Sequence, residues 1–215
     1  LGHVVNAIHV WGEARALGGS VLLRIEDHDR DRCRPEYETA LLEDLDWLGF
    51  APDIYPTYTF RVGRCESRQS DRGAIYATMA ERLREQGLVY ACGCTRRVLG
   101  HEVPYPGTCR QLGLPFDGDV GWRVRVPAGA ITFDDQWRGV QTQMPAAQCG
   151  DLLIRDRRGN WTYQFVATVD DYLQGITHII RGTDLLSSTG RQILLGQLLG
   201  RPEPAAFAHH GLIMK

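Results

Sequence analysis

The sequence has 215 residues, and 43% of them are hydrophobic, which allows a buried core and excludes a disordered chain. No apolar run approaches the roughly twenty residues of a membrane span, and residues 1–6 lack the features of a secretory signal. We therefore expect a soluble cytoplasmic protein without a membrane partner. The net charge of −2 neither supports nor excludes binding to nucleic acids, because phosphate binding depends on local patches of positive charge.

The first part of the chain predicts helices that alternate with short strands. Apolar residues recur at helical spacing from Val4 onward, and Gly18-Gly19 would end that helix. Pro35 is suited to open the next helix, because a proline in the first turn loses no helical hydrogen bond. In chain order we expect a helix over 4–17, a strand over 21–25, a helix over 35–48, a long loop over 51–73, a helix over 75–86 and a strand over 88–90.

The middle of the chain differs in composition, with cysteines, glycines and prolines between Ala91 and about Gln148. Short alternating runs there predict a small β-rich insertion. Strands at 152–154 and 176–181 and a helix capped by Ser187, Ser188 or Thr189 then continue the first pattern. This order predicts an α/β fold, a parallel sheet with helices on both faces, split by the insertion. The predicted units are residues 1–90, 91–148 and 149–215.

Two short polar segments are candidates for ligand binding. Gly2-His3 stands at the start of the first predicted helix, where free N–H groups favour anions, although such a pair is more often a capping detail. Glu26 and Asp27 follow a predicted strand, where two carboxylates could receive an ammonium group. The equal alternative is that Asp27 and its acidic neighbours cap the helix after Pro35.

Three cysteines form the sharpest local pattern. Cys92, Cys94 and Cys109 lie within eighteen residues beside glycine and proline, which indicates a zinc site rather than free thiols. A structural zinc site has four protein ligands, and the fourth is open at this stage. His101 is the chemically ordinary choice, whereas Tyr105 would have to lose a proton whose pKa is ordinarily near ~10.

Polar residues near two later elements complete the candidates. Arg181 ends a predicted strand, where it could hold a carboxylate through a bidentate pair. Tyr163 precedes an apolar stretch and, taken alone, is more simply a core aromatic residue. Asp170-Asp171 fits a metal or catalytic pair and equally a turn before Gly175.

Taken in order, these segments resemble the glutamate-specific class I aminoacyl-tRNA synthetases. The resemblance covers nearly the whole chain, apart from a longer loop at 54–71, and rests on several ordered blocks. They are Leu1-Gly2-His3 with Asn6-Ala7, Arg24-Ile25-Glu26-Asp27, Asp46-Trp47-Leu48-Gly49, Val169-Asp170-Asp171 and Ile180-Arg181-Gly182. Three further segments resemble the branch that loads glutamate onto queuosine in tRNA(Asp): Tyr105 to Arg110, Trp161 to Gln164 and Arg181 to Leu186 with Ser188-Thr189.

The resemblance implies a Rossmann-like fold, and a monomer that activates L-glutamate with ATP and Mg²⁺ and transfers it to queuosine-containing tRNA(Asp). It implies that Glu26, Tyr163 and Arg181 contact glutamate and that His3 stabilises the transition state of adenylation. It also implies that Cys92, Cys94, Tyr105 and Cys109 bind a structural zinc ion.

The sequence departs from the family pattern at both ends. The family's first strand with its Arg-x-Ala-Pro-Ser segment does not precede Leu1, and the Lys-Leu-Ser-Lys loop does not follow Lys215, so we expect truncation at both ends. Two alternatives stay open. One is a truncated glutamyl-tRNA synthetase that charges the 3′ end of tRNA(Glu). The other is a non-enzymatic, zinc-stabilised relic that binds RNA or nucleotide.

Overall fold

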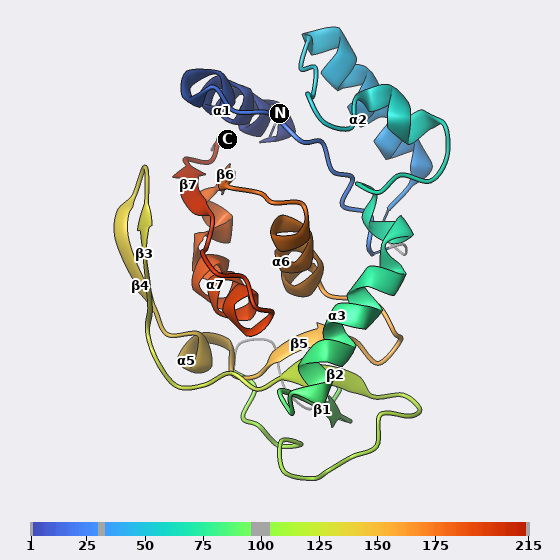
Figure 1. Ribbon diagram of the computed structural model, residues 1–215, viewed down its shortest axis with the longest axis vertical. Helices are drawn as coiled ribbons and strands as arrows, with labels where there is room; N and C mark the ends of the chain where they lie inside the picture. The colour runs from blue at the N-terminus through green and yellow to red at the C-terminus, as the bar shows by residue number, and fades with distance from the viewer. Residues whose placement is uncertain (1, 30–32, 96–103, 214–215) are drawn as a thin grey trace.

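Two separate sheets form the framework of the computed structural model, which describes residues 2–29, 33–95 and 104–213 (Figure 1). The first sheet is antiparallel and has the order β1-β2-β5, with β1 Val89–Cys92, β2 Gly121–Val124 and β5 Leu152–Arg155. The second has the order β4-β3-β7-β6, with β3 Ile131–Asp135, β4 Gly139–Gln143, β6 His178–Gly182 and β7 Ala206–His210. Within it β7 runs parallel to both β3 and β6, whereas β4 is antiparallel to β3.

The helices confirm several boundaries predicted from the sequence. Helix α2 begins at Pro35, and its C-cap Gly49 has a positive φ of 74°, a conformation that suits glycine. The α-helices are α1 Gly2–Leu17, α2 Pro35–Leu48, α3 Gly73–Glu85, α5 Pro145–Cys149, α6 Tyr163–Leu173 and α7 Thr189–Leu198. Short 3₁₀ turns lie at η1 Thr57–Arg61, η2 Gln69–Asp71 and η3 Thr183–Ser188, so the predicted loop at 51–73 contains two of them.

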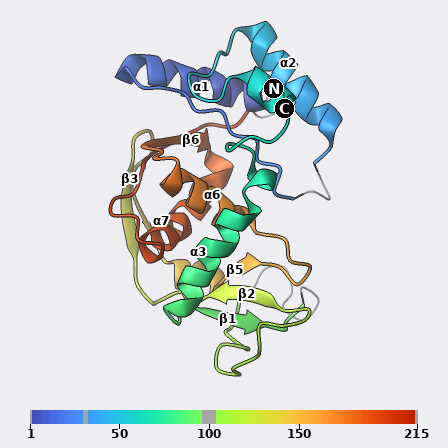
Figure 2. The same cartoon turned by 45° about the vertical axis from the view of Figure 1, so that its right-hand side comes forward.

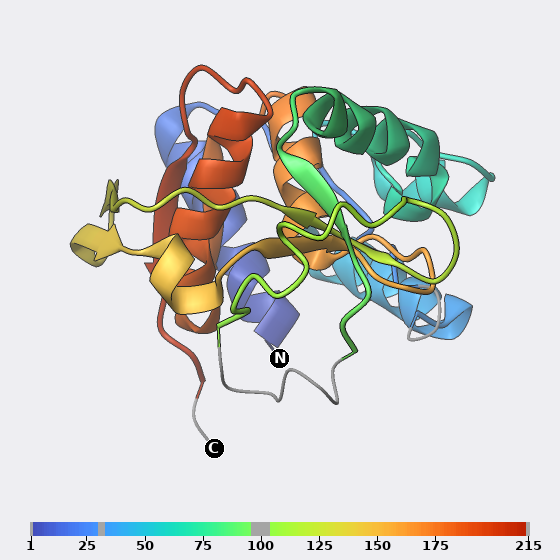
Figure 3. The ribbon, with the colours of Figure 1, turned by 90° about the horizontal axis from the view of Figure 1, so that it is seen from below.

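The main core lies around α6. This helix occupies the centre of the molecule, between α7 and α3, and the three-stranded sheet closes the space below it (Figures 1 and 2). Seen from below, that sheet lies in front of α6 (Figure 3). The apolar cluster includes Leu83 of α3, Ile154 of β5, Phe165 of α6 and Leu195 of α7, all fully buried. Apolar burial on this scale stabilises the position of α6 relative to α3, α7 and the three-stranded sheet.

The structure confirms an α/β fold but corrects the predicted sheet. One sheet is antiparallel and the other mixed, so the prediction of a single parallel sheet is wrong. Residues 21–25 form only isolated bridges, Leu22 with Ile54 and Ile25 with Arg68, and are not a strand of either sheet. The predicted strand at 152–154 is present as β5, but it pairs with β2. The division at residues 91 and 148 stays a prediction.

Within the described ranges, no helix is both long enough and apolar enough to cross a bilayer.

Candidate functional site

The carboxyl ends of β6 and β7 form the kind of edge at which parallel strands place ligands. Arg181 lies near the end of β6 and is 8% exposed. Its guanidinium donates from Nε to His209 Nε2 (3.0 Å), from Nη1 to Gln192 Oε1 (2.7 Å) and from Nη2 to Thr189 Oγ1 (2.9 Å). None of these hydrogen-bond partners is acidic, and Asp171, which feels the charge of Arg181, is paired with Arg24 instead. A buried cation with neutral partners is suited to bind an anion.

Helix α1 lies beside this edge, above β6 and β7 (Figure 1). The ring of His9 stacks on His210 at the end of β7, with centroids 4.8 Å apart, and His210 Nε2 lies 3.2 Å from Asn6 Oδ1. These contacts hold the first half of α1 against the strand ends. His3 stands exposed in the first turn, next to backbone N–H groups that have no helical acceptor. The start of α1 therefore offers donors for an anion near the strand ends.

Tyr163 begins α6 and lies among the other two residues that the resemblance assigns to glutamate. Burial raises the pKa of its hydroxyl, nearby Glu26 raises it further, and Arg181 opposes the shift. The charges of Glu26 and Arg181 thus both reach the Tyr163 hydroxyl. No hydrogen bond joins His3 to these three residues, all of which belong to the described part of the chain. A shared glutamate site of Glu26, Tyr163 and Arg181 therefore stays a prediction, and His3 stands on α1 without a hydrogen bond to any of them.

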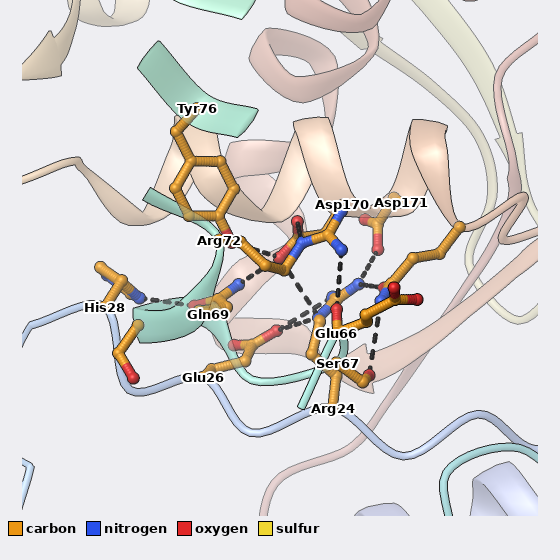
Figure 4. Close-up of polar contacts among 12 residues, drawn as sticks. Arg24, Glu26, His28, Glu66, Ser67, Gln69, Arg72, Tyr76, Asp170 and Asp171 are labelled. Carbon is orange, nitrogen blue, oxygen red and sulfur yellow. Dashed lines mark hydrogen bonds and ion pairs between the residues drawn. The ribbon is translucent and has the colours of Figure 1, made fainter. Parts of the chain in front are cut away.

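Glu26 is positioned from α6 through an arginine (Figure 4). Arg24 donates from Nη2 to Glu26 Oε1 at 3.0 Å and from Nη1 to Asp171 Oδ1 at 2.9 Å. Burial lowers the pKa of Arg24, but Asp171, Glu26 and Asp170 together raise it above its ordinary value. The side chain of Glu26 remains 41% exposed, so its second oxygen is open to a ligand.

Asp170 anchors the same region from inside α6. It is fully buried and accepts hydrogen bonds from three side chains: Tyr76 (2.8 Å), Arg72 (2.8 Å) and Gln69 (3.0 Å). The Asp170-Asp171 pair therefore lies within a helix and not in a turn, which corrects that alternative. Both carboxylates hold arginines, so their role here is to fix the elements around the site.

The carboxylate of Asp27 forms hydrogen bonds within the fold. It accepts from the backbone N–H of Ser70 (2.8 Å) and from the Ser70 hydroxyl (2.6 Å). It does not cap α2, whose start has no side-chain cap, so the capping alternative is wrong for this residue. Next to it His28 bonds to Gln69 (2.7 Å) and faces the ring of Tyr163 at 6.4 Å. An open pocket of about 280 Å³ adjoins these residues, lined by His28, Gln69, Ser70, Gly73, Tyr76 and Trp161.

The predicted zinc ligands come together at the end of β1. The sulfur atoms of Cys92, Cys94 and Cys109 all lie within 4.8 Å of one another. The Tyr105 hydroxyl is 3.4 Å from Cys92 Sγ and accepts from the backbone N–H of Cys109 at 2.8 Å. In a tetrahedral site with Zn–S bonds of ~2.3 Å, sulfurs are about 3.8 Å apart, so the cluster fits zinc. His101 lies outside the described residues.

Tyr105 is held in this cluster by its surroundings. The guanidinium of Arg123 lies over its ring at 3.8 Å, and Tyr105 pairs with Gly150 in an isolated bridge. Gly150 has a φ of 64°, and a Cβ there would be 2.1 Å from the Tyr105 carbonyl oxygen. Only glycine allows this approach, so Gly150 places the tyrosine next to the thiols.

The structure reveals site residues that the sequence analysis missed. His209, Gln192 and Thr189 surround Arg181, and Asp135 of β3 contacts His209. Thr189 was considered as a helix cap and as part of a family-like segment, not as a partner of Arg181, and Asp135 was counted within the β-rich insertion. Of these residues only Thr189 stands at a predicted element end. No strand was predicted at Asp135 or His209, so no local pattern indicated that they approach Arg181.

Comparisons with known proteins agree with this arrangement. Residues 1–102 and 114–215 match the family described as tRNA synthetases class I (E and Q), catalytic domain. The chain is 43% identical over 217 residues to the Glutamyl-Q tRNA(Asp) synthetase of Cupriavidus metallidurans, a match that covers 95% of this chain and 66% of the relative. It is 42% identical over 201 residues to that of Acinetobacter baylyi, covering 94% and 65%. The chain thus spans about two thirds of these relatives.

Two solved structures share the fold. A glutamate tRNA ligase from Elizabethkingia meningosepticum, in complex with its amino acid, is 26% identical with a TM-score of 0.84, covering 99% of this chain and 47% of that one. A glutamate-tRNA synthetase from Elizabethkingia anophelis is 28% identical with a TM-score of 0.85, covering 100% and 48%. The similarity inferred from the ordered sequence blocks is confirmed.

Proposed function

Because this chain belongs to the class I tRNA synthetases of the E and Q group, we propose that it activates L-glutamate with ATP and transfers it to queuosine in tRNA(Asp). The observation that supports this most is the sequence identity of 42–43% to several Glutamyl-Q tRNA(Asp) synthetases over nearly the whole chain. Within the structure, the convergence of Glu26, Tyr163 and Arg181 supports an amino-acid site of the matching charge.

Each end of glutamate would meet a group of opposite charge. Arg181 would bind a carboxylate through the N–H groups that its neutral neighbours leave free, and a planar guanidinium does so in a bidentate way. Glu26, held by Arg24, would accept the ammonium group. Tyr163 would add a hydroxyl between them. These roles are part of the proposal.

The chemistry would proceed in two steps. A carboxylate oxygen of glutamate attacks the α-phosphorus of ATP, and the bond to pyrophosphate breaks to give glutamyl-adenylate. The nucleophile of queuosine then attacks the acyl carbon, and AMP leaves. His3 and the N–H groups at the start of α1 would stabilise negative charge on the phosphate in the first step. Magnesium would accompany ATP.

Zinc would have a structural role. Cys92, Cys94, Cys109 and Tyr105 would supply four ligands, which would leave no position for a reacting water. The site lies at the end of β1, on the three-stranded sheet, so the metal would join Tyr105 and Cys109 to the end of that strand.

The acceptor is the part of the proposal that needs a direct test. Anticodon loops present unstacked bases, which are the usual targets of specific RNA recognition. We expect the intact protein, as a monomer, to exchange pyrophosphate with ATP in the presence of glutamate and without tRNA. Labelled glutamate should then appear on tRNA(Asp) that contains queuosine and be absent when guanosine replaces it.

A second candidate follows from the solved structures, which are named as glutamate tRNA ligases and synthetases. If label accumulates on the 3′ end of tRNA(Glu), the chain is part of a glutamyl-tRNA synthetase. Absence of label on both tRNAs, together with absence of pyrophosphate exchange, would contradict both functions.

A further inference from the structure

A buried carboxylate–imidazole pair lies directly behind Arg181. Asp135 and His209 are 1% and 0% exposed, and His209 Nδ1 lies 2.5 Å from Asp135 Oδ2. On the other side of the same ring, Nε2 accepts from Arg181 Nε at 3.0 Å. The three residues come from adjacent strands β3, β7 and β6, so the sheet itself sets their order.

Asp135 is held in place from its own strand end. Its Oδ1 accepts from the backbone N–H groups of Trp137 (3.2 Å) and Arg138 (3.0 Å), in the turn between β3 and β4. Burial alone would raise the pKa of this carboxyl, but the hydrogen bonds from His209 and the backbone lower it below its ordinary value. Asp135 is therefore ionised at neutral pH and can only accept hydrogen bonds.

Asp135 and Arg181 together fix which nitrogen of the His209 ring carries the proton. A carboxylate can only accept, so Nδ1 carries a proton, and a guanidinium can only donate, so Nε2 is unprotonated. The hydroxyl of Thr189, 3.3 Å from Nε2, is consistent with this because it can donate to the same lone pair. His209 is thus a neutral imidazole of fixed tautomer.

We propose that Asp135 and His209 are positioning residues that set the orientation of the Arg181 guanidinium for its carboxylate ligand. His209 accepts the Nε–H of Arg181, Thr189 accepts one N–H of Nη2, and Gln192 accepts one N–H of Nη1. Of the five N–H groups of the guanidinium, the remaining ones have no partner among the described residues. The inference rests on the proposed function, since it assigns Arg181 a carboxylate of glutamate.

Asp135 and His209 would affect the affinity for glutamate by setting the direction in which the Arg181 guanidinium points. A bidentate pair requires the guanidinium plane to be aligned with the carboxylate, and rotation about the Arg181 side chain would lose one of the two bonds. With Asp135 removed, the opposite tautomer becomes available, and its Nε2–H would face the Nε–H of Arg181. The guanidinium would then move away from the imidazole.

The test uses glutamate binding by calorimetry and the KM for glutamate in pyrophosphate exchange, both with the intact protein. Asp135→Asn and His209→Leu should weaken glutamate binding about tenfold to a hundredfold and raise the KM for glutamate, while the KM for ATP stays unchanged. His209→Gln can still present an acceptor to Arg181 and should recover part of the loss. Asp156→Asn is the matched control, because Asp156 also accepts backbone N–H groups in a turn, those of Arg158 and Asn160, but contacts no histidine.

A spectroscopic measurement separates positioning from general damage. In protein labelled with ¹⁵N-histidine, His209 should show a protonated Nδ1 and an unprotonated Nε2 at neutral pH, and Asp135→Asn should change this pattern. The opposite tautomer in the unmodified protein would overturn the inference. The inference would also be overturned if Asp135→Asn and His209→Leu bind glutamate with unchanged affinity while Arg181→Ala abolishes binding. That result would leave the proposed function intact. If Arg181→Ala itself binds glutamate normally, the assignment of Arg181 fails.

Discussion

At the scale of single residues, the surroundings of Arg181 explain why a change of side chain there should be costly. The guanidinium has three neutral partners and is 8% exposed, so its charge is separated from water without an acidic partner among the described residues. A lysine would keep the charge but lose the planar fork and the contacts with His209, Thr189 and Gln192.

We therefore expect Arg181→Lys and Arg181→Ala to weaken glutamate binding by about 2–5 kcal/mol, or tens- to thousands-fold, as for other truncated buried charge contacts. Calorimetry on the intact protein measures this, and Arg84→Lys is the control, since Arg84 is exposed and pairs with Glu81. Unchanged affinity in Arg181→Ala would refute the assignment.

His209 predicts a dependence of stability on pH. Burial lowers its pKa, Asp135 opposes this, and Arg181 and Arg138 lower it further. The unfolded chain binds the proton near pH ~6.5, whereas the folded protein binds it only at lower pH. Between these two values the unfolded state carries more protons, so stability falls as pH is lowered through ~6.5.

The expected result is that the melting temperature drops less between pH 7 and pH 5 in His209→Gln than in the unmodified protein. Scanning calorimetry at several pH values gives the two slopes. The exposed His178 provides the control, because His178→Gln should leave the slope unchanged. Equal slopes in His209→Gln and the unmodified protein would contradict the prediction.

At the scale of elements, α6 is the part that holds the site together. Residues Phe165 to Asp171 are all buried, and the helix carries Tyr163 at its start and two carboxylates near its end. Through Asp170 it binds Tyr76 of α3 and Gln69 of η2, and through Asp171 it binds Arg24 and so positions Glu26. The site therefore depends on polar contacts between elements that lie far apart in the sequence.

Asp170→Asn should destabilise the fold by about 3–5 kcal/mol, because it leaves the buried guanidinium of Arg72 without its counter-charge. Urea unfolding measures the loss. Glu81→Gln removes an acid from a solvent-exposed pair with Arg84, so it should change stability far less than Asp170→Asn does. Similar losses in the two variants would show that burial of Asp170 does not determine its contribution.

The thiol cluster on the three-stranded sheet gives a prediction about metal. Purified protein should contain one zinc ion, and Cys109→Ser should lose it and unfold at a lower temperature, since structural zinc contributes folding free energy. Metal analysis should find full zinc in Cys65→Ser, because Cys65 lies outside the cluster. Full zinc in Tyr105→Phe together with its loss in His101→Ala would identify His101 as the fourth ligand.

At the scale of the whole molecule, net charge is a poor guide to the acceptor. The total is −2, but all 24 basic residues except Lys215 are arginines, whose planar forks suit phosphate groups. If arginines contact loop phosphates, transfer to tRNA should weaken as salt rises. We expect glutamylation of tRNA(Asp) to fall as the salt concentration rises from about 50 to about 200 mM. Pyrophosphate exchange with glutamate alone should change little, and an equal decline of both would contradict phosphate contacts.

Local sequence rules by themselves determined much of the helical structure. Pro35 and Gly49 mark the ends of α2, because one has a fixed φ suited to a first turn and the other adopts a positive φ at low cost. The spacing of Cys92, Cys94 and Cys109 also indicated the cluster that the structure brings together. In both cases the determining interactions lie within a few residues or one short segment.

The tertiary structure alone decided the sheets and the surroundings of Arg181. Helix α6 was not predicted because its buried Asp170 and Asp171 fit a turn or a catalytic pair when only the sequence is considered. Inside the helix they are paired with Arg72 and Arg24, which lie far away in the chain. Apolar runs such as 152–154 fit a strand of either sheet, and only pairing with β2 placed β5. Asp135, Arg181 and His209 are far apart in the chain and meet only because β3, β7 and β6 are neighbours. Strand order depends on the packing of the whole chain, which no local pattern contains.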